Sequence, residues 1–455
     1  MSSDYLKRWD TGHRSPIHDR IRRLYRALRA SQHWSRSEWE AYLLKRLKRL
    51  VSHAWSHVPL YRSHWGEMPE IQSLEDFARL PILERSVVSN NPDLLRATTL
   101  PPGVQVGAPT TTSGSTGQVV RVHADTESVA AGAAAEILAM EWEEVDPTLP
   151  TAYVRTYSSG PPETVAALSK GVRIPRWASG PLREMFPWGD AFLIDASTSP
   201  DWIAQFLDAA KPQRLIGYPT VLLMTTDHWK PGYALRSVRC YGENLHQADK
   251  ERLEERLGTR VWNAWSANET GPIANECPDT PGRLHLHAYL HYVEVVREDG
   301  EPCEPGESGS ILITPLYSVA TPLVRYRLGD QATLGECECE RTLPALASMD
   351  GRTFSMFRLR DGRRMLASRV IDRLGKIPGL VRFQILQWEY GRLEMLLVTA
   401  EADYQAVSVQ AERLLREFFA DEGEISVECR RVEELPLAPS GKFEKVRWMG
   451  HRDPK

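Results

Sequence analysis

Cysteine is scarce in this chain of 455 residues, and its six occurrences follow no regular spacing. They are Cys240, Cys277, Cys303, Cys337, Cys339 and Cys429. The pattern matches no disulfide framework, and a cytosolic chain would keep these residues as thiols. Cys337 and Cys339 are closer together than the usual pair of zinc ligands, and the spacing from Cys277 to His285 fits no zinc signature. Whether Cys277 and His285 bind a metal therefore stays open.

The sequence also lacks a long apolar run and an excess of basic residues. No stretch is long enough to span a bilayer, and the first residues are polar and charged, without an apolar signal region. The net charge of −4 argues against nucleic-acid binding, which usually needs a basic surface. With 42% hydrophobic and 25% charged residues, the composition is that of an ordinary globular protein of two or three domains, which we expect in the cytoplasm.

One stretch is richer in hydroxyl residues and glycine than a helix or a strand would favour. It comprises Thr112, Ser113, Gly114, Ser115, Thr116 and Gly117. Hydroxyls compete with the backbone for hydrogen bonds and glycine permits unusual dihedral angles, so such a loop can surround phosphate oxygens with N–H and O–H donors. No Gly-Lys-Ser/Thr closes it, which excludes a Walker loop. A flexible surface linker is the alternative interpretation.

The middle of the chain alternates between strand-like and helix-like segments. Strands are expected at residues 191–194, 214–216, 238–241 and 260–264, and helices at residues 201–210 and 246–257. This βαβ pattern predicts parallel strands, whose carboxyl ends meet at the edge of the sheet where ligands bind. Residues 217–219, 242–244 and 265–269 follow such strand ends, so we expect these three segments as loops at one rim.

The N-terminal flank is helical in pattern. A lead-in over residues 1–80 contains a helix at residues 17–30, and a second helix is expected to begin with a capping box at Ser37. Asp125 has the position of an N-cap before an alanine-rich helix that ends near Glu141, and such helices usually serve as packing material.

The C-terminal part shows two further changes of pattern. Strand-like residues 292–296 and 310–314 indicate an antiparallel subdomain that leads to Asp330. Beyond Arg352, a hairpin about Gly391, a helix and a strand predict a small α+β domain with its own core.

Four later segments follow the Ser/Thr/Gly loop. They are Trp265-Ser266-Ala267-Asn268-Glu269, Arg325-Tyr326-Arg327-Leu328-Gly329-Asp330, Gly351-Arg352 and Pro439-Ser440-Gly441-Lys442. With the loop, this series resembles the adenylate-forming superfamily, which contains acyl-CoA synthetases, peptide-synthetase adenylation domains and firefly luciferase. Gly217-Tyr218-Pro219-Thr220, the run from Glu276-Cys277 to His285 and residues 383–387 resemble its phenylacetate–CoA ligase-like branch, including the capsular-polysaccharide-biosynthesis type. The resemblance covers roughly residues 80–447.

The resemblance implies an α/β fold in two domains. Residues 1–352 would form a large adenylation domain with mixed and parallel sheets flanked by helices, together with the antiparallel subdomain. Residues 353–455 would form a small mobile α+β domain, and Ser355 would lie at the hinge. Hinges are a few residues that absorb backbone rotation.

The resemblance also implies a role for each motif. Lys442 would be the catalytic lysine, and Glu269 would help to hold Mg²⁺, a hard cation that takes oxygen ligands. The acyl pocket would be bordered by Tyr218 and Ala264. Asp330 would bind the ribose hydroxyls and Trp265 would stack on adenine. The remaining ATP- or AMP-binding residues would be Thr112, Ser113, Gly114, Ser115, Thr116, Gly117, Gly242, Glu243, Asn244, Ser266, Asn268 and Arg352.

The chain departs from the superfamily pattern in places. Val119 and Val120 stand where many members have proline and lysine, and Trp265, Ser266 and Asn268 stand where Tyr, Gly and Thr or Ser are usual. Glu243 has a second interpretation, because a loop carboxylate can also bind a cationic group of an amino-acid substrate.

The leading hypothesis is a ligase that activates a carboxylic acid with ATP and Mg²⁺ through an acyl-adenylate and then acylates coenzyme A. Two alternatives remain: transfer to an amine or a carrier-protein thiol, and a non-catalytic descendant that only binds nucleotide or acyl ligand. The sequence chooses neither the acid nor the acceptor, and it leaves open whether the protein is a monomer or a homodimer.

Overall fold

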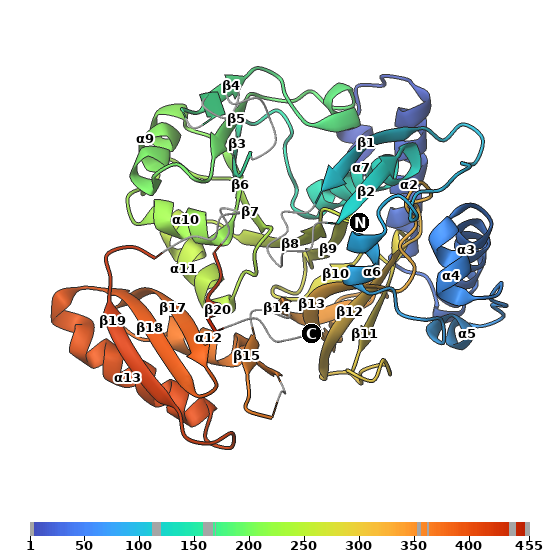
Figure 1. Cartoon of the computed structure of the whole chain (residues 1–455). Coiled ribbons are helices and arrows are strands. Elements are labelled where there is room, and N and C mark those ends of the chain that lie inside the picture. The colour runs from blue at the N-terminus through green and yellow to red at the C-terminus, as the bar shows by residue number, and fades with distance from the viewer. Residues whose placement is uncertain are drawn as a thin grey trace.

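The structure is a computed structural model that describes residues 4–111, 120–157, 167–168, 170–352, 356–361, 364–435 and 443–450. A large N-terminal region is built on a twelve-stranded sheet, and a smaller α+β region follows it (Figure 1). This arrangement confirms the predicted fold class.

The large sheet has the strand order β11-β12-β13-β14-β10-β9-β8-β7-β6-β3-β5-β4. Its strands are β3 (Thr151–Arg155), β4 (Val172–Ile174), β5 (Ala191–Asp195), β6 (Arg214–Gly217), β7 (Ser237–Tyr241), β8 (Val261–Ala267), β9 (Gly271–Glu276), β10 (Leu284–Leu286), β11 (His291–Val296), β12 (Ser308–Pro315), β13 (Tyr326–Gly335) and β14 (Ala345–Arg352). From β5 to β8 neighbouring strands are parallel, as predicted. The predicted antiparallel subdomain is instead the continuation of this sheet, because β9 pairs with β8 in an antiparallel hairpin.

Helices cover both faces of this sheet. They are α1 (Tyr5–Trp9), α2 (Pro16–Ser31), α3 (Arg36–His57), α4 (Pro59–Trp65), α5 (Leu74–Ala78), α6 (Arg85–Asn90), α7 (Thr126–Trp142), α9 (Pro200–Ala210), α10 (Pro219–Thr226), α11 (Gln247–Leu257) and the 3-10 helix η1 (Gly180–Glu184). Asp125 caps α7, as predicted. The capping box predicted at Ser37 is wrong, because Ser35 and Glu38 form it and α3 begins at Arg36. Within the described residues, no helix is long and apolar enough to cross a membrane.

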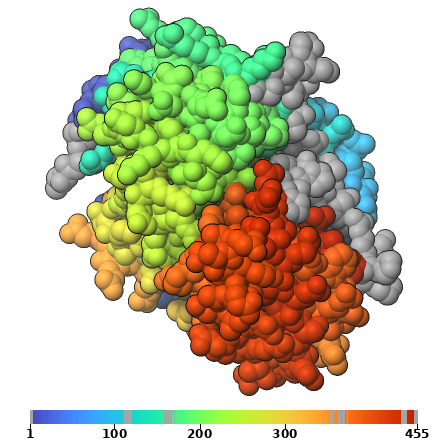
Figure 2. All heavy atoms as spheres, turned by 90° about the vertical axis from the view of Figure 1, so that its left-hand side faces the viewer, coloured from blue at the N-terminus to red at the C-terminus, as the bar shows by residue number. Residues whose placement is uncertain are grey.

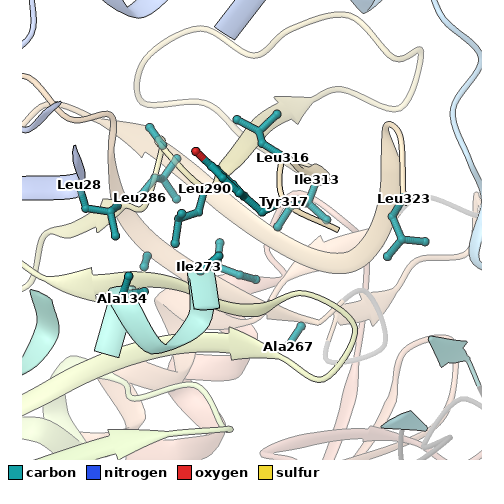
Figure 3. Packing of buried hydrophobic residues seen from close by; sticks show 14 of the residues in the cluster. Leu28, Ala134, Ala267, Ile273, Leu286, Leu290, Ile313, Leu316, Tyr317 and Leu323 are labelled. Atoms are coloured by element: carbon teal, nitrogen blue, oxygen red, sulfur yellow. The ribbon is translucent and has the colours of Figure 1, made fainter. Parts of the chain in front are cut away.

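The predicted helical lead-in is part of the main core. Leu28 of α2 and Ala134 of α7 share one buried cluster with Ile273 of β9 and Tyr317, which follows β12 (Figure 3). Helices α2 and α7 lie against one another in this core. On the other side of the parallel strands, a second cluster packs α9, α10 and α11 against them, with Ala152, Leu215 and Val238 as examples from the strands.

The C-terminal region has a separate four-stranded sheet with the order β19-β18-β17-β20. Its elements are β15 (Met356–Arg358), β16 (Arg364–Leu366), α12 (Ser368–Gly375), β17 (Leu380–Glu389), β18 (Arg392–Thr399), the 3-10 helix η2 (Glu401–Asp403), α13 (Tyr404–Phe418), β19 (Ser426–Arg431) and β20 (Val446–Trp448). The hairpin about Gly391 is confirmed, with φ of +80° at the glycine. A distinct core begins at Phe357. The domain boundary between residues 352 and 353 stays a prediction, since residues 353–355 lie outside the described part.

The orange and red C-terminal region lies against the yellow-green part of the chain (Figure 2), and helix α11 is one of the elements that it contacts. Arg252 donates through Nη2 to the carbonyl oxygens of Gly375 and Leu380, at 3.2 Å each. One turn earlier, Asp249 pairs with Lys445. Polar and charged contacts therefore hold this orientation, and contacts of this kind separate at less cost than an apolar core.

Candidate functional site

A cavity of about 490 Å³ lies between α7 and the large sheet. Five predicted site residues line it: Ala264, Trp265, Ser266, Asn268 and Glu269. Residues 265–269 were predicted to lie in a loop, whereas β8 extends to Ala267 and only Asn268 and Glu269 lie in the turn before β9. The difference arises because β9 pairs back onto β8 and keeps this segment extended, with a bulge between Trp265 and Ser266.

Trp265 and Asp330 are directly bonded. The indole Nε1 of Trp265 donates to Oδ2 of Asp330 over 3.2 Å, and both residues are buried. Asp330, predicted to bind the ribose hydroxyls, lies inside β13, where its Cα partner on β14 is Arg352. The structure therefore brings together three residues that the sequence separates widely, while the side chain of Arg352 lies outside the described part.

Glu269 is buried, with 4% of its side chain exposed, and it pairs with a residue that the sequence analysis missed. Arg85, the first residue of α6, donates through Nη1 to Oε1 of Glu269 over 2.8 Å and to the hydroxyl of Tyr326 over 3.0 Å. Burial, and then the Glu269 charge, raise the pKa of Tyr326 above its ordinary range, so this hydroxyl stays protonated. The arginine compensates the buried carboxylate, which would otherwise be costly.

The loops after β6 and β7 form a second part of the rim. Gly242 has φ of +78°, and a Cβ there would lie 2.8 Å from Cε1 of Tyr218, so a side chain would collide with the ring. Tyr218 in turn packs against Tyr241 at 5.5 Å between ring centroids. Gly242 is therefore needed both for its backbone conformation and for the approach of Tyr218. Tyr218 itself does not line the cavity beside α7, whereas Ala264 does.

Both carboxylate oxygens of Glu243 accept backbone N–H groups. Oε2 accepts from Thr220 at the start of α10 over 3.2 Å, and Oε1 accepts from Phe443 over 2.8 Å. These contacts do not favour the alternative in which Glu243 binds a cationic substrate group. In the neighbouring Asn244, Nδ2 is buried and has no hydrogen-bond partner among the described residues, so it can serve a ligand.

Several predicted site residues lie outside the described part: Thr112, Ser113, Gly114, Ser115, Thr116, Gly117, Ser355 and Lys442. Two strands that the sequence analysis did not predict border the Ser/Thr/Gly loop. They are β1 (Val106–Thr111) and β2 (Arg121–Asp125), which pair so that Thr111 faces Arg121. Thr110 precedes the loop and Val122 and His123 follow it. All three residues line the cavity, so the strands on both sides of the loop reach the cavity wall.

Charged and phenolic side chains line the cavity beneath α7, and these were also missed. Alternate residues of three parallel strands face it: Tyr153, Arg155, Arg214, Ile216, Arg239 and Tyr241. From α7, Glu136 binds Nη1 of Arg239 through both oxygens at 2.7 Å. Gly132 and Ser128 of α7 also line the cavity, so this helix does more than pack. Among the strands expected from the sequence, only residues 238–241 carried a signal of this cavity, with Arg239 and Tyr241 at alternate positions.

Arg325 and Arg327 have structural roles. Arg325 pairs with Glu294 at 3.0 Å, and Arg327 pairs with Glu84 at 2.9 Å. Glu84 directly precedes Arg85, and Leu83 forms a β-bridge with Tyr326. These contacts hold the start of α6 against β13 and so position Arg85 beside Glu269.

Comparison with known proteins gives relatives over most of the chain. No family model matches. A phenylacetate-coenzyme A ligase of Thermus thermophilus is 27% identical over 79% of this chain and 80% of its own length. The phenylacetate-coenzyme A ligase of Escherichia coli is 23% identical over 83% of this chain and 85% of its own length.

Solved structures share the fold. The structure of 2-hydroxyisobutyryl-CoA ligase in the postadenylation state, in complex with R3-HIB-AMP, has a TM-score of 0.72 at 18% identity and covers 98% of this chain and 96% of that chain. An open conformation of the same ligase, with 2-HIB-AMP and CoA, has a TM-score of 0.58 at 18% identity over 98% of both chains.

Proposed function

We propose that this chain, a relative of the phenylacetate-coenzyme A ligases with the fold of the adenylate-forming ligases, activates a carboxylic acid with ATP and transfers the acyl group to coenzyme A. The observation that carries the proposal is the bond between Trp265 and Asp330 beside the cavity that Glu269 lines. These are the residues that the resemblance assigns to adenine, ribose and Mg²⁺.

In this proposal ATP enters along the rim formed by β8, β13 and the Ser/Thr/Gly loop. The carboxylate of Asp330 accepts the ribose hydroxyls, and the indole of Trp265 covers adenine while its N–H orients Asp330. Residues 112–117 donate to the β- and γ-phosphates. Because the ends of that loop begin at the cavity wall, the phosphates and the acid meet at one place.

Glu269 is the residue that would hold Mg²⁺. Its Oε1 receives the contacts from Arg85 and Tyr326, so we assign Oε2 to the cation. A carboxylate oxygen in a turn suits a hard cation, and Mg²⁺ bound there would neutralise charge on the phosphates. Arg85 holds the carboxylate in place by a charged hydrogen bond.

Lys442 supplies the cation for the attack of the acid on the α-phosphate. The backbone N–H of Phe443, the next residue in the sequence, donates to Glu243 at the rim, and this contact supports the assignment. A preorganised cation at the reacting oxygens stabilises charge that is greatest in the transition state. The two conformations of 2-hydroxyisobutyryl-CoA ligase, with TM-scores of 0.72 and 0.58, support two orientations of the small C-terminal domain, with Ser355 at the hinge.

The acid occupies the cavity beneath α7. Arg155, Arg239 and Glu136 line it together with Tyr153 and Tyr241. Buried charged groups are satisfied by polar partners rather than by hydrocarbon, so we propose an acid that carries hydroxyl or other polar groups beyond its carboxylate. Nε of Arg155 and Nη2 of Arg239 are buried and have no hydrogen-bond partner among the described residues, and a purely aliphatic acid would leave both without one.

A pyrophosphate-release assay over a panel of acids tests the proposal and separates the alternatives. Hydroxylated and aromatic acids are each supplied with ATP and Mg²⁺, first with coenzyme A and then with amines or a carrier protein. Acid-dependent pyrophosphate release with acyl-CoA formation supports the proposal. Release with transfer only to an amine or carrier protein identifies the other acceptor class. A folded protein that binds ATP but releases no pyrophosphate with any acid would be the non-catalytic descendant.

A further inference from the structure

Three cysteines and one histidine converge outside the site described above. They are Cys277, His285, Cys337 and Cys339. Cys277 follows β9 and His285 lies on β10, whereas Cys337 and Cys339 lie between β13 and β14. The three sulfur atoms and one histidine nitrogen all lie within 4.8 Å of one another.

We propose that these four side chains form a structural zinc site. Tetrahedral zinc with three cysteines and one histidine is a standard structural ligand set, with Zn–S distances of about 2.3 Å. That distance corresponds to about 3.8 Å between sulfur atoms, which is compatible with the observed upper limit of 4.8 Å. Four protein ligands leave no open position, so the site is structural rather than catalytic.

The surrounding donors match bound thiolates. The backbone N–H of Thr280 donates to Sγ of Cys277 over 3.3 Å, and that of Arg341 donates to Sγ of Cys339 over 3.4 Å. The Arg341 guanidinium pairs with Asp279. N–H donors and a nearby cation stabilise negative charge on sulfur and orient the ligands.

The neighbouring histidines His287 and His291 do not belong to this group, and Nε2 of each contacts another residue. His287 lies with Nε2 2.8 Å from Oδ1 of Asn275, and His291 lies with Nε2 2.8 Å from the carbonyl oxygen of Pro272. His285 alone approaches a cysteine, with its Nε2 3.2 Å from Sγ of Cys339. The short separation of Cys337 and Cys339 in the sequence argued against a zinc site formed by this pair alone. Cys277 and His285, which come from another hairpin, complete the set of four ligands.

The zinc would join two hairpins that carry site residues. Strand β9 begins just after the turn that contains Glu269 and ends just before Cys277. Strand β13 contains Asp330 and ends two residues before Cys337. Strand β10 pairs with both β9 and β14 between them. A metal at these ends would fix the register of strands whose other ends hold the candidate nucleotide residues, so its loss would lower the melting temperature.

Metal analysis of the whole chain tests the site. The protein is purified without chelators and dialysed, and zinc is measured against protein by mass spectrometry. We expect close to one zinc per chain, and loss of that zinc in Cys339→Ser and His285→Ala, measured on material that elutes as folded monomer or dimer. Cys429→Ser is the matched control, because Cys429 is a partly exposed thiol in β19 and should keep the zinc.

Two further measurements keep the result decisive. Another group in the described part, His13, His18 and Glu184, could bind metal adventitiously, so zinc that disappears in His13→Ala would contradict the proposal. If the ligand variants do not fold, the wild-type chain is produced with Co²⁺, and thiolate-to-cobalt charge-transfer bands are expected. Wild-type protein without zinc or these bands, or with a disulfide among these cysteines, would overturn the proposal. None of these readouts depends on ligase activity.

Discussion

Oδ2 of Asp330 lies 3.2 Å from the indole Nε1 of Trp265, across 65 residues of sequence. The bond joins β8 to β13, two strands that are not neighbours in the sheet. It therefore sets the orientation of the carboxylate in the absence of a ligand. In the proposed function, this preorganisation would lower the entropic cost of nucleotide binding.

Asp330→Ala should weaken ATP binding by about 1.5 to 3 kcal/mol, the range for a lost hydrogen bond to a charged group. Calorimetry with a non-hydrolysable ATP analogue measures the change. Trp265→Phe is the companion variant, since it keeps an aromatic ring and removes the N–H donor, so its loss should be smaller. Unchanged affinity in Asp330→Ala would place this residue outside the nucleotide site.

Glu269→Gln should abolish Mg²⁺-dependent adenylation, because the amide is a poor ligand for the cation while it can still accept the hydrogen bond from Arg85. Arg85→Gln is the control, since it breaks the same ion pair and keeps the carboxylate. Because Arg85 holds the carboxylate in place, we expect the control to lose part of its activity but to remain dependent on Mg²⁺. Folding of both variants is checked by circular dichroism, and full activity in folded Glu269→Gln would refute the metal assignment.

Ser355→Pro should lock one orientation of the C-terminal region, because proline fixes φ. Adenylation and acyl transfer are then measured separately, the second with a preformed adenylate. We expect one half-reaction to suffer much more than the other. Equal loss of both, or loss of neither, would count against a hinge at this position.

Stability should fall on acidification because buried histidines resist protonation. Burial lowers the pKa of His246 to about 3 and that of His291 to about 4, from an ordinary value of 6.5. Below pH 6.5, these histidines therefore bind protons in the unfolded chain but stay neutral in the folded chain. The free energy of unfolding should be fully retained above pH 6.5 and decrease towards pH 4, by about 1.4 kcal/mol per pH unit for each such histidine.

Urea unfolding at several pH values measures this decrease. His291→Gln can still donate to the carbonyl oxygen of Pro272 and removes one titrating group. Its stability should decline less steeply with falling pH than that of the wild type. Parallel pH profiles for the two proteins would show that His291 does not contribute.

Local patterns predicted the parallel half of the sheet well. Gly258 ends α11 in the left-handed conformation, and β5, β6 and β7 have the alternation or apolar run typical of buried strands. The Trp265 segment was misjudged because its extension depends on pairing with β9, which is not evident from the segment itself. Short elements such as β16 and β20 have too few residues for a period to show.

The sequence predicted individual residues of the candidate site, but it did not predict which residues contact one another. Glu269 was identified from its motif, yet its partner Arg85 is 184 residues away in the sequence and carries no motif. The sequence left open whether Cys277 and His285 bind a metal, and it did not indicate that Cys337 and Cys339 join them, because the two halves of this cluster come from separate hairpins. Ion pairs and metal ligand sets depend on tertiary structure, whereas motifs depend on local sequence.

Acid-dependent exchange of labelled pyrophosphate into ATP, without any acceptor, tests adenylate formation most directly. Wild-type protein and Lys442→Ala are compared with the best acid of the panel, and both are given a preformed acyl-adenylate with coenzyme A. The account predicts exchange in the wild type, a loss of about two or more orders of magnitude in Lys442→Ala, and retained acyl transfer in that variant. Absence of acid-dependent exchange in the folded wild type, or equal exchange in Lys442→Ala, would contradict it.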